Sequence, residues 1–207
     1  NTDNNYNNDG ATGAKAMAAG INAKAAGDSS IAIGNAQVLE KSTVRQSASE
    51  GAVAIGDTAK AAGRHAITLG AGKAQEENAI AIGSNANSSG AASIAMGASA
   101  VSSETNGISI GSSANTGAAN SIAIGANSST VALSDGSVAL GSSSQADRAA
   151  INAARVSANA IPTVANNQVY ALASASATDL SKITETVKGN LGAISVGTQN
   201  ATRQIIN

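Results

Sequence analysis

The chain has 207 residues, of which 43% are hydrophobic and 12% charged, with a formal net charge of −1 and no Cys, Phe or Trp. The low and mixed charge argues against a nucleic-acid partner and against a polybasic membrane-binding segment, because both need clustered basic residues. Without cysteine there is neither a disulfide scaffold nor a thiolate metal site. Much of the apolar content is alanine, so association with other chains is the expected source of further burial.

Residues 1–10 are polar and predict a poorly ordered lead-in. From residue 11 a five-residue motif recurs: a small residue, a larger apolar residue, a small residue, a second larger apolar residue and then glycine. Its ten copies close at glycines 20, 34, 56, 70, 83, 97, 111, 125, 141 and 197. The steps between these glycines are 14, 22, 14, 13, 14, 14, 14, 16 and 56 residues. A period this regular predicts a structural unit that stacks on itself.

Each repeat predicts two short strands. Residues 30–34 (SIAIG) alternate with period two, as strands do. A weaker Ala-x-Ala phrase, such as residues 59–61, comes after it at a fixed offset, and a glycine such as Gly63 marks the next turn. Two strands per coil of about 14 residues predict an all-β parallel solenoid, flattened into a roll, over residues 11–141.

The two faces of the first strand predict a core and an interface. Placing the large residues inside the roll gives the expected core: Ile31, Ile33, Val53, Ile55, Ile80, Ile82, Ile122 and Ile124. The opposite face is then outward and small, and we interpret it as a subunit interface: Ala32, Ala54, Ala81, Ala95, Ala123 and Ala139. A strand that is apolar on both faces is usually buried on both. The alternative is that alanine there simply tolerates solvent.

Two segments interrupt the period. The step from Gly34 to Gly56 is eight residues longer than the repeat, so residues 35–50 predict a loop outside the stacked coils. This loop holds a dense set of polar residues, and it is a candidate ligand-contact or interchain loop, or else a tolerated surface insertion: Glu40, Lys41, Arg45 and Gln46.

The second interruption, residues 142–192, predicts an adaptor. A Ser144-x-x-Asp147 pattern could cap a helix, although an irregular stretch fits as well. An apolar stripe beginning at Leu180 predicts a short amphipathic helix. Tyr170 is interpreted as a packing anchor of this segment. We expect residues 193–207 to form a final coil of the roll, followed by a short further segment.

No residue pattern predicts catalysis, a cofactor or a metal site. His65 is the only histidine and has no second metal-ligand type at a suitable spacing. Glu76 and Glu77 are adjacent, so their carboxylates point apart. A β-helix enzyme would need a six-residue period or an acidic cleft, and an ice-binding solenoid would need a flat array of Thr-x-Thr; the sequence has neither. The stacked repeats therefore predict an extended surface that leaves little room for an active site.

The repeats resemble a known family. Residues 120–125 (NSIAIG), their near copies and the trailing Ala-x-Ala are similar to the head repeats of trimeric autotransporter adhesins, the YadA-like head. The resemblance covers residues 11–141. A second similarity supports it: residues 192–197 (GAISVG), together with Arg203, Gln204 and Ile205, resemble the last coil and the start of the family's neck.

The resemblance carries expectations about assembly and function. It implies a left-handed parallel β-roll, a homotrimer, a coiled-coil stalk, and an outer-membrane anchor outside residues 1–207. It further implies display on a Gram-negative bacterial surface and binding of host matrix proteins, of the collagen, fibronectin or laminin class, or of host cell receptors. The alternative is a spacer head that mediates bacterial autoaggregation. The host ligand stays open at this point.

Overall fold

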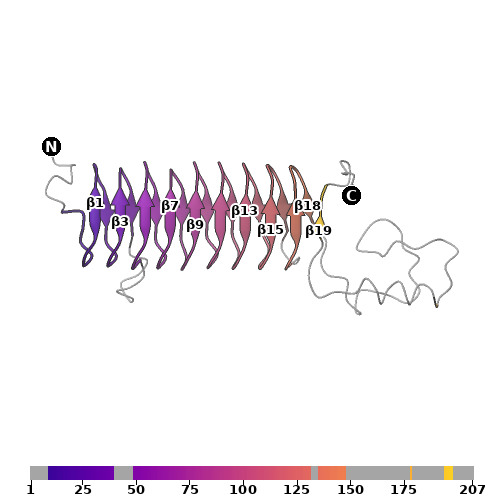
Figure 1. Cartoon of the computed structure of the whole chain (residues 1–207), viewed down its shortest axis with the longest axis horizontal. Helices are drawn as coiled ribbons and strands as arrows, with labels where there is room; N and C mark the ends of the chain where they lie inside the picture. Colours follow the sequence, from indigo (N-terminus) through magenta and orange to yellow (C-terminus); the bar gives the residue numbers. More distant parts are fainter. Residues whose placement is uncertain (1–8, 40–48, 132–134, 148–177, 179–193, 198–207) are drawn as a thin grey trace, which may run out of the picture.

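In the computed structural model, residues 9–39, 49–131, 135–147, 178 and 194–197 are described, and those of the roll form an elongated stack of coils (Figure 1). Each coil contributes one strand to each of two sheets. The first sheet holds β1 (Met17–Ala19), β3 (Ile31–Ile33), β5 (Val53–Ile55), β7 (Ile67–Leu69), β9 (Ile80–Ile82), β11 (Ile94–Met96), β13 (Ile108–Ile110), β15 (Ile122–Ile124), β17 (Val138–Leu140) and β19 (Ile194–Ser195). The second holds β2 (Lys24–Ala25), β4 (Gln37–Val38), β6 (Lys60–Ala61), β8 (Lys73–Ala74), β10 (Asn87–Ser88), β12 (Val101–Ser102), β14 (Asn115–Thr116), β16 (Ser129–Thr130) and β18 (Gln145–Ala146).

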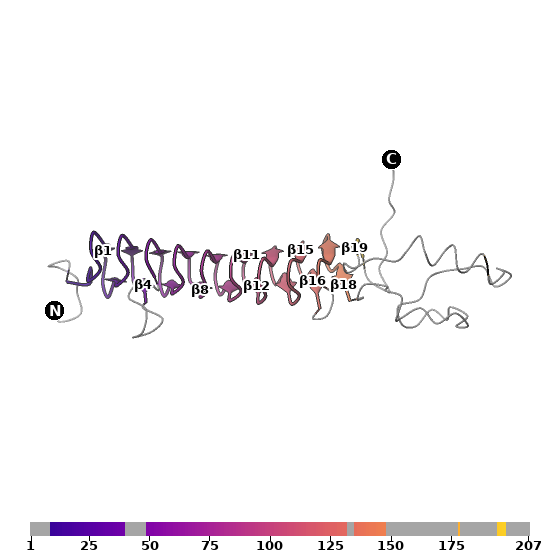
Figure 2. The ribbon, with the colours of Figure 1, turned by 90° about the horizontal axis from the view of Figure 1, so that it is seen from below.

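Both sheets are parallel, and neighbouring coils lie next to each other in strict order, ten strands in the first sheet and nine in the second. Figure 2 shows the two sheets as facing layers of one flat roll. Equivalent positions of successive repeats pair directly, for example Ile94 with Ile108 and Ala95 with Ser109. The expected parallel roll with coils of about 14 residues is therefore confirmed.

The register survives the long step in the sequence. Ile31 pairs with Val53 even though 22 residues separate their repeats. On either side of residues 40–48, the Leu39 backbone N–H donates to the Ala61 carbonyl oxygen, and the Ser49 carbonyl oxygen accepts from the Ala52 N–H. The extra residues therefore lie between β4 and β5 and leave the stacking of the flanking strands unchanged.

The interior of the roll is made of small side chains, and here the predicted assignment of faces is wrong. The alanines predicted to form a subunit interface are fully buried inside the roll: Ala32, Ala54, Ala81, Ala95, Ala123 and Ala139. The residues predicted to form the core are partly or substantially exposed on the outside of the first sheet: Ile31, Ile33, Val53, Ile55, Ile80, Ile82, Ile122 and Ile124.

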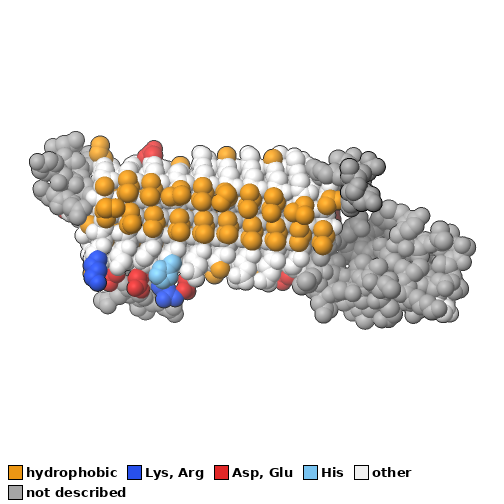
Figure 3. All heavy atoms as spheres, viewed as in Figure 1, with side chains coloured by type: hydrophobic (Ala, Val, Ile, Leu, Met, Phe, Trp, Pro, Cys, Tyr) orange, Lys and Arg blue, Asp and Glu red, His pale blue; other side chains and the backbone are white. Residues whose placement is uncertain are grey.

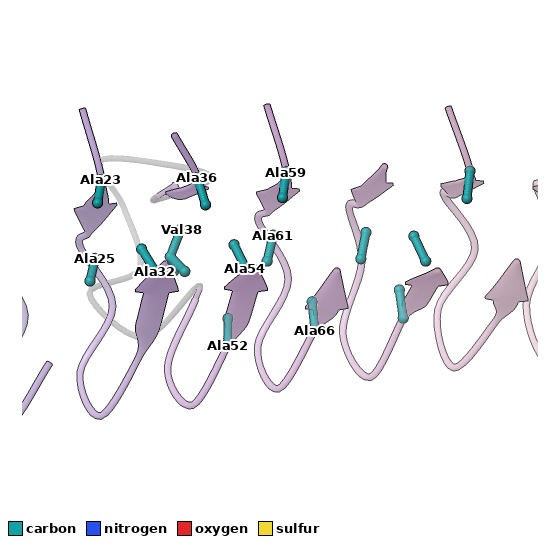
Figure 4. Packing of buried hydrophobic residues seen from close by; sticks show 14 of the residues in the cluster. Ala23, Ala25, Ala32, Ala36, Val38, Ala52, Ala54, Ala59, Ala61 and Ala66 are labelled. Atoms are coloured by element: carbon teal, nitrogen blue, oxygen red, sulfur yellow. The ribbon is translucent and has the colours of Figure 1, made fainter. Parts of the chain in front are cut away.

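The reason is the thinness of the roll. Strands of only three and two residues face one another, and the side chains of both must share the gap between them (Figure 4). Val38 is the largest side chain that is fully buried, and the other fully buried positions hold Ala, Ser or Thr. Close packing at this spacing leaves no volume for an inward isoleucine in every coil. The large residues therefore point outward.

Buried hydroxyls join the two sheets in several coils. The Thr68 hydroxyl donates to the Lys60 carbonyl oxygen at 2.9 Å, and the Thr116 hydroxyl donates to the Ile108 carbonyl oxygen at 2.9 Å. Ser109 and Thr116 also bond to each other, with 2.6 Å between their hydroxyl oxygens. These bonds satisfy polar groups that would otherwise destabilise a buried position.

The corners between strands require unusual backbone conformations. Gly97 has φ of 135°, and a Cβ built there would lie 2.5 Å from the Gly111 carbonyl oxygen of the next coil. The other corner repeatedly places a residue with positive φ, among them His65 and Asn106. Their N–H groups donate to the preceding coil, as His65 does to the Glu50 carbonyl. Stacked corners thus continue the hydrogen bonding of the sheets.

The roll extends beyond its predicted end. Strand β18 belongs to the second sheet and lies inside the segment predicted as an adaptor. Ser144 is buried in the roll, where its hydroxyl donates to the Leu140 carbonyl, so it does not cap a helix as predicted. The predictions for residues 1–8, Tyr170, the helix near Leu180, and residues 198–207 lie outside the described residues.

Candidate adhesive surfaces

The outward face of the first sheet is a continuous apolar surface. Two columns of side chains run in register from β1 to β17, and Figure 3 shows them as two unbroken rows. We call this surface the isoleucine stripe. It consists of Met17, Ile31, Val53, Ile67, Ile80, Ile94, Ile108, Ile122 and Val138, with Ala19, Ile33, Ile55, Leu69, Ile82, Met96, Ile110, Ile124 and Leu140.

The stripe is long and only partly shielded from solvent. The stripe covers nine of the ten strands of the first sheet, β1 to β17, and at about 4.8 Å per strand spacing it is about 38 Å long. Within it Ile55 is 36% exposed, Ile124 39% and Leu140 40%. Single exposed apolar residues are ordinary, but contiguous patches of this length mark interaction surfaces. The stripe is therefore the strongest candidate contact surface among the described residues.

The outward face of the second sheet is polar. In the middle of its strands the outward position is taken by one residue per coil, and in the first five coils these residues pair in register. We call them the donor column, because each side chain carries an N–H group: Lys24, Gln37, Lys60, Lys73 and Asn87. In the next two coils the equivalent position changes to Val101 and then Asn115.

Charged residues also gather at the corner that leads from the second sheet to the first, seen along the lower edge of Figure 3. There Arg64 forms an ion pair with Glu77, and both side chains are about half exposed, at 46% and 48%. An exposed pair of this kind contributes about 0–1 kcal/mol. His65 is exposed at the same corner, beside Gly51 of the preceding coil.

Among the described residues no group of His, Cys, Asp and Glu is arranged to hold a metal ion. Glu76 and Glu77 differ in surroundings, since Glu76 is half-buried and Glu77 pairs with Arg64. In the same part of the chain, no helix is long and apolar enough to cross a membrane. The candidate functional features of the described residues are therefore the isoleucine stripe, the donor column and the charged corner.

The predicted contact loop and neck are not among the residues that the structure describes. Glu40, Lys41, Arg45 and Gln46 fall in residues 40–48, and Arg203, Gln204 and Ile205 fall in residues 198–207. The structure does place the point where the loop joins the roll, between β4 and β5. Sequence reasoning misses the isoleucine stripe and the donor column as surfaces, because it places the large residues of the stripe in the core and gives the x position of Ala-x-Ala no role.

Comparison with known proteins identifies the repeats. The family model described as "YadA head domain repeat (2 copies)" matches residues 11–36, 48–72, 74–100, 102–128 and 129–149. Among solved structures, the crystal structure of the collagen-binding domain of the Yersinia adhesin YadA is similar, with 22% sequence identity and a TM-score of 0.46. That match covers 93% of this chain and 76% of the YadA chain. No curated protein matches.

The family match spans more than half of the chain. Its unmatched gap at residues 37–47 lies within the predicted loop of residues 35–50, and its last segment, residues 129–149, includes β18. The paired register and the family model therefore agree that the stack of coils continues past residue 141, where the sequence pattern ends it. The chain belongs to the family of YadA head domain repeats, and it is a YadA-like adhesin head and not an enzyme.

Proposed function

We propose that the head works as a homotrimer that binds host matrix proteins or cell receptors through several identical surfaces at once. The single observation that carries the assembly is the isoleucine stripe. No other described part of the chain covers its residues, and a second and third copy of the same chain would cover them along the roll. The first sheets would then face a common axis and the second sheets would face outward.

The energetics favour this arrangement. Burying a Val, Leu, Ile or Met side chain contributes about 1.5–3 kcal/mol. Stripe residues such as Met96, which is 38% exposed, have roughly a third of this still to gain, about 0.5–1 kcal/mol each. The gain recurs in every coil, because the columns are in register. The proposed interface thus replaces the predicted alanine interface, whose residues are inside the roll.

Three rigid copies suit attachment by weak contacts. Linked sites bind as if at a high local concentration, so each contact can be weak and the whole head still holds. We propose that the ligand is a matrix protein of the collagen, fibronectin or laminin class, or a host cell receptor. The loop with Glu40, Lys41, Arg45 and Gln46 is proposed to add selectivity, because it is the main irregularity in an otherwise repetitive surface.

The segments after the roll complete the proposal. Residues 148–192, the part of the predicted adaptor that follows β18, are proposed to pack against neighbouring chains, and residues 193–207, with Arg203, Gln204 and Ile205, to form the final coil and begin the neck. We propose that the head is displayed on the outer surface of a Gram-negative bacterium, carried by a stalk and an outer-membrane anchor. These statements rest on the family, since adhesins of this kind are surface-exposed.

The assembly is tested by mass. Size-exclusion chromatography with light scattering is expected to give a trimer for the wild-type head and a monomer for the double variant Ile82→Glu, Ile110→Glu, whose charges would face the common axis without partners. The matched control is Val101→Glu, which puts the same charge on the outward face of the second sheet. We expect the control to remain trimeric.

Attachment is measured on surfaces coated with collagen, fibronectin or laminin. The wild type and the Val101→Glu control should attach to at least one of them, and the stripe variant should lose attachment because it loses the other copies. A stripe variant with unchanged trimer mass would refute the interface. Trimers that attach to no host ligand but hold cells to one another would support an autoaggregating spacer head instead.

A further inference from the structure

The donor column is a row of positive and amide groups on the outward face of the second sheet. Lys24 pairs in register with Gln37, Gln37 with Lys60, Lys60 with Lys73, and Lys73 with Asn87. All three lysines are exposed. No carboxylate interrupts the column over these five strands. The column ends at Val101, which cannot donate a hydrogen bond from its side chain.

The charges in this column are not neutralised by the rest of the roll. Lys60 and Lys73 face each other directly on neighbouring strands, and like charges so placed are destabilising. Among the described residues, none of the three lysines forms an ion pair. Asp57 lies in a corner instead, where its carboxylate accepts a hydrogen bond from the Asn35 amide at 2.9 Å. The fold thus keeps an unfavourable repulsion that a bound anion would relieve.

The geometry of the column fits a linear ligand. The strands stack along the long axis of the roll, so the column runs parallel to that axis (Figure 2). Successive members are about 4.8 Å apart, which puts Lys24 about 14 Å from Lys73. At the far end the Gln75 amide donates to the Asn87 side-chain oxygen at 2.8 Å, which holds the Asn87 side chain in place. Amide groups between the lysines can donate to hydroxyl or sulfate oxygens.

We propose that the donor column binds a linear sulfated polysaccharide of the glycosaminoglycan class, laid along the roll. Lysine is a compact point charge that suits sulfate oxygens, and rows of basic residues are typical of heparin-binding patches. A single-stranded nucleic acid would call for aromatic side chains on which bases stack, and the described residues contain no Phe, Tyr or Trp. The inference rests on the proposed adhesive role, because it needs the second sheet to face outward.

Heparin is the probe for the test, and the purified head is the protein. The variant Lys60→Gln, Lys73→Gln removes two charges, and Gln37 already occupies the same column, so the fold should persist. The matched control is Lys15→Asn, which removes an exposed charge at a corner with positive φ, a conformation that Asn tolerates. We expect heparin affinity to fall roughly fivefold per column lysine, or about 25-fold for the variant, and to change little in the control.

Three outcomes would overturn the proposal: an equal loss of affinity in the Lys15→Asn control, equal binding of chemically desulfated heparin, or equal binding of single-stranded DNA, which would indicate general attraction of polyanions. Wild-type affinity should also fall between 50 and 200 mM salt. Attachment to collagen, fibronectin and laminin separates the two proposals. If heparin binding depends on the donor column but the head attaches to no matrix protein, the donor-column proposal holds and matrix-protein adhesion is refuted. If the head attaches to a matrix protein but heparin binding does not depend on the column, only the donor-column proposal is refuted.

Discussion

The substitution Ala81→Leu tests whether small residues fill the roll. Ala81 is fully buried, pairs with Thr68 and Ala95 in the neighbouring coils, and lies close to Gly72, where an added Cβ would be 3.5 Å from the Ala81 Cβ. Leucine adds three carbon atoms to a gap that is already filled from both sheets. Overpacking of this kind costs about 1–3 kcal/mol. For a chain of this size the melting temperature should fall by about 2–12 °C.

The assay is thermal unfolding measured by circular dichroism, with wild type and variant at equal protein concentration, because assembly makes the melting temperature concentration-dependent. The matched control is Ala98→Leu, the same chemical change at an exposed corner position. The control should melt within a degree or two of the wild type. An Ala81→Leu head that keeps its melting temperature but fails to assemble would refute the inward assignment of the alanines and restore the predicted interface.

Two further predictions concern buried hydroxyls and corners. Thr130 has a buried hydroxyl with no hydrogen-bond partner, so Thr130→Val should stabilise the head by up to about 1 kcal/mol. Thr116→Val instead breaks the hydrogen bonds to Ile108 and Ser109, so it should destabilise the head by about 1–3 kcal/mol. Chemical denaturation measures the free energy of unfolding of both threonine variants. Equal changes in the two would contradict the hydrogen-bond assignments. Gly97→Ala combines a strained φ with a clash against Gly111 and should lower the free energy of unfolding by about 1–3 kcal/mol or more. The control Asn106→Gly should change it little. Equal denaturation midpoints for the two variants would show that the corner can relax.

The period of the sequence predicts the coils because each closing glycine has a physical task. At Gly97 and Gly111 only a residue without Cβ can adopt the corner and let the next coil approach. The first strand of every coil is therefore visible in the sequence. The second strand is less visible, since Ser128 and Thr130 or Ser144 and Ala146 replace the Ala-x-Ala pattern. The sequence therefore predicts, wrongly, that β18 lies outside the roll.

The faces could not be read from the sequence by hydrophobicity alone. Period two shows that Ile80 and Ile82 share a face and that Ala79 and Ala81 share the other, but both faces are apolar, so the pattern is the same either way. The deciding quantity is the distance between the sheets, which depends on the short second strand and its small residues. The usual expectation that large residues lie inside gave the wrong answer in a roll too thin to hold them.

The register that carries the stack across insertions also has a consequence for how such heads change in evolution. Each coil contacts only its neighbours, and equivalent residues pair whether their repeats are 13, 14, 16 or 22 residues apart. A recombination event that duplicates or deletes one whole repeat would therefore leave every remaining pair intact. The reach of the head can grow or shrink in increments of one strand spacing, about 4.8 Å. A change in the length of the head then needs a change in copy number and no new residues.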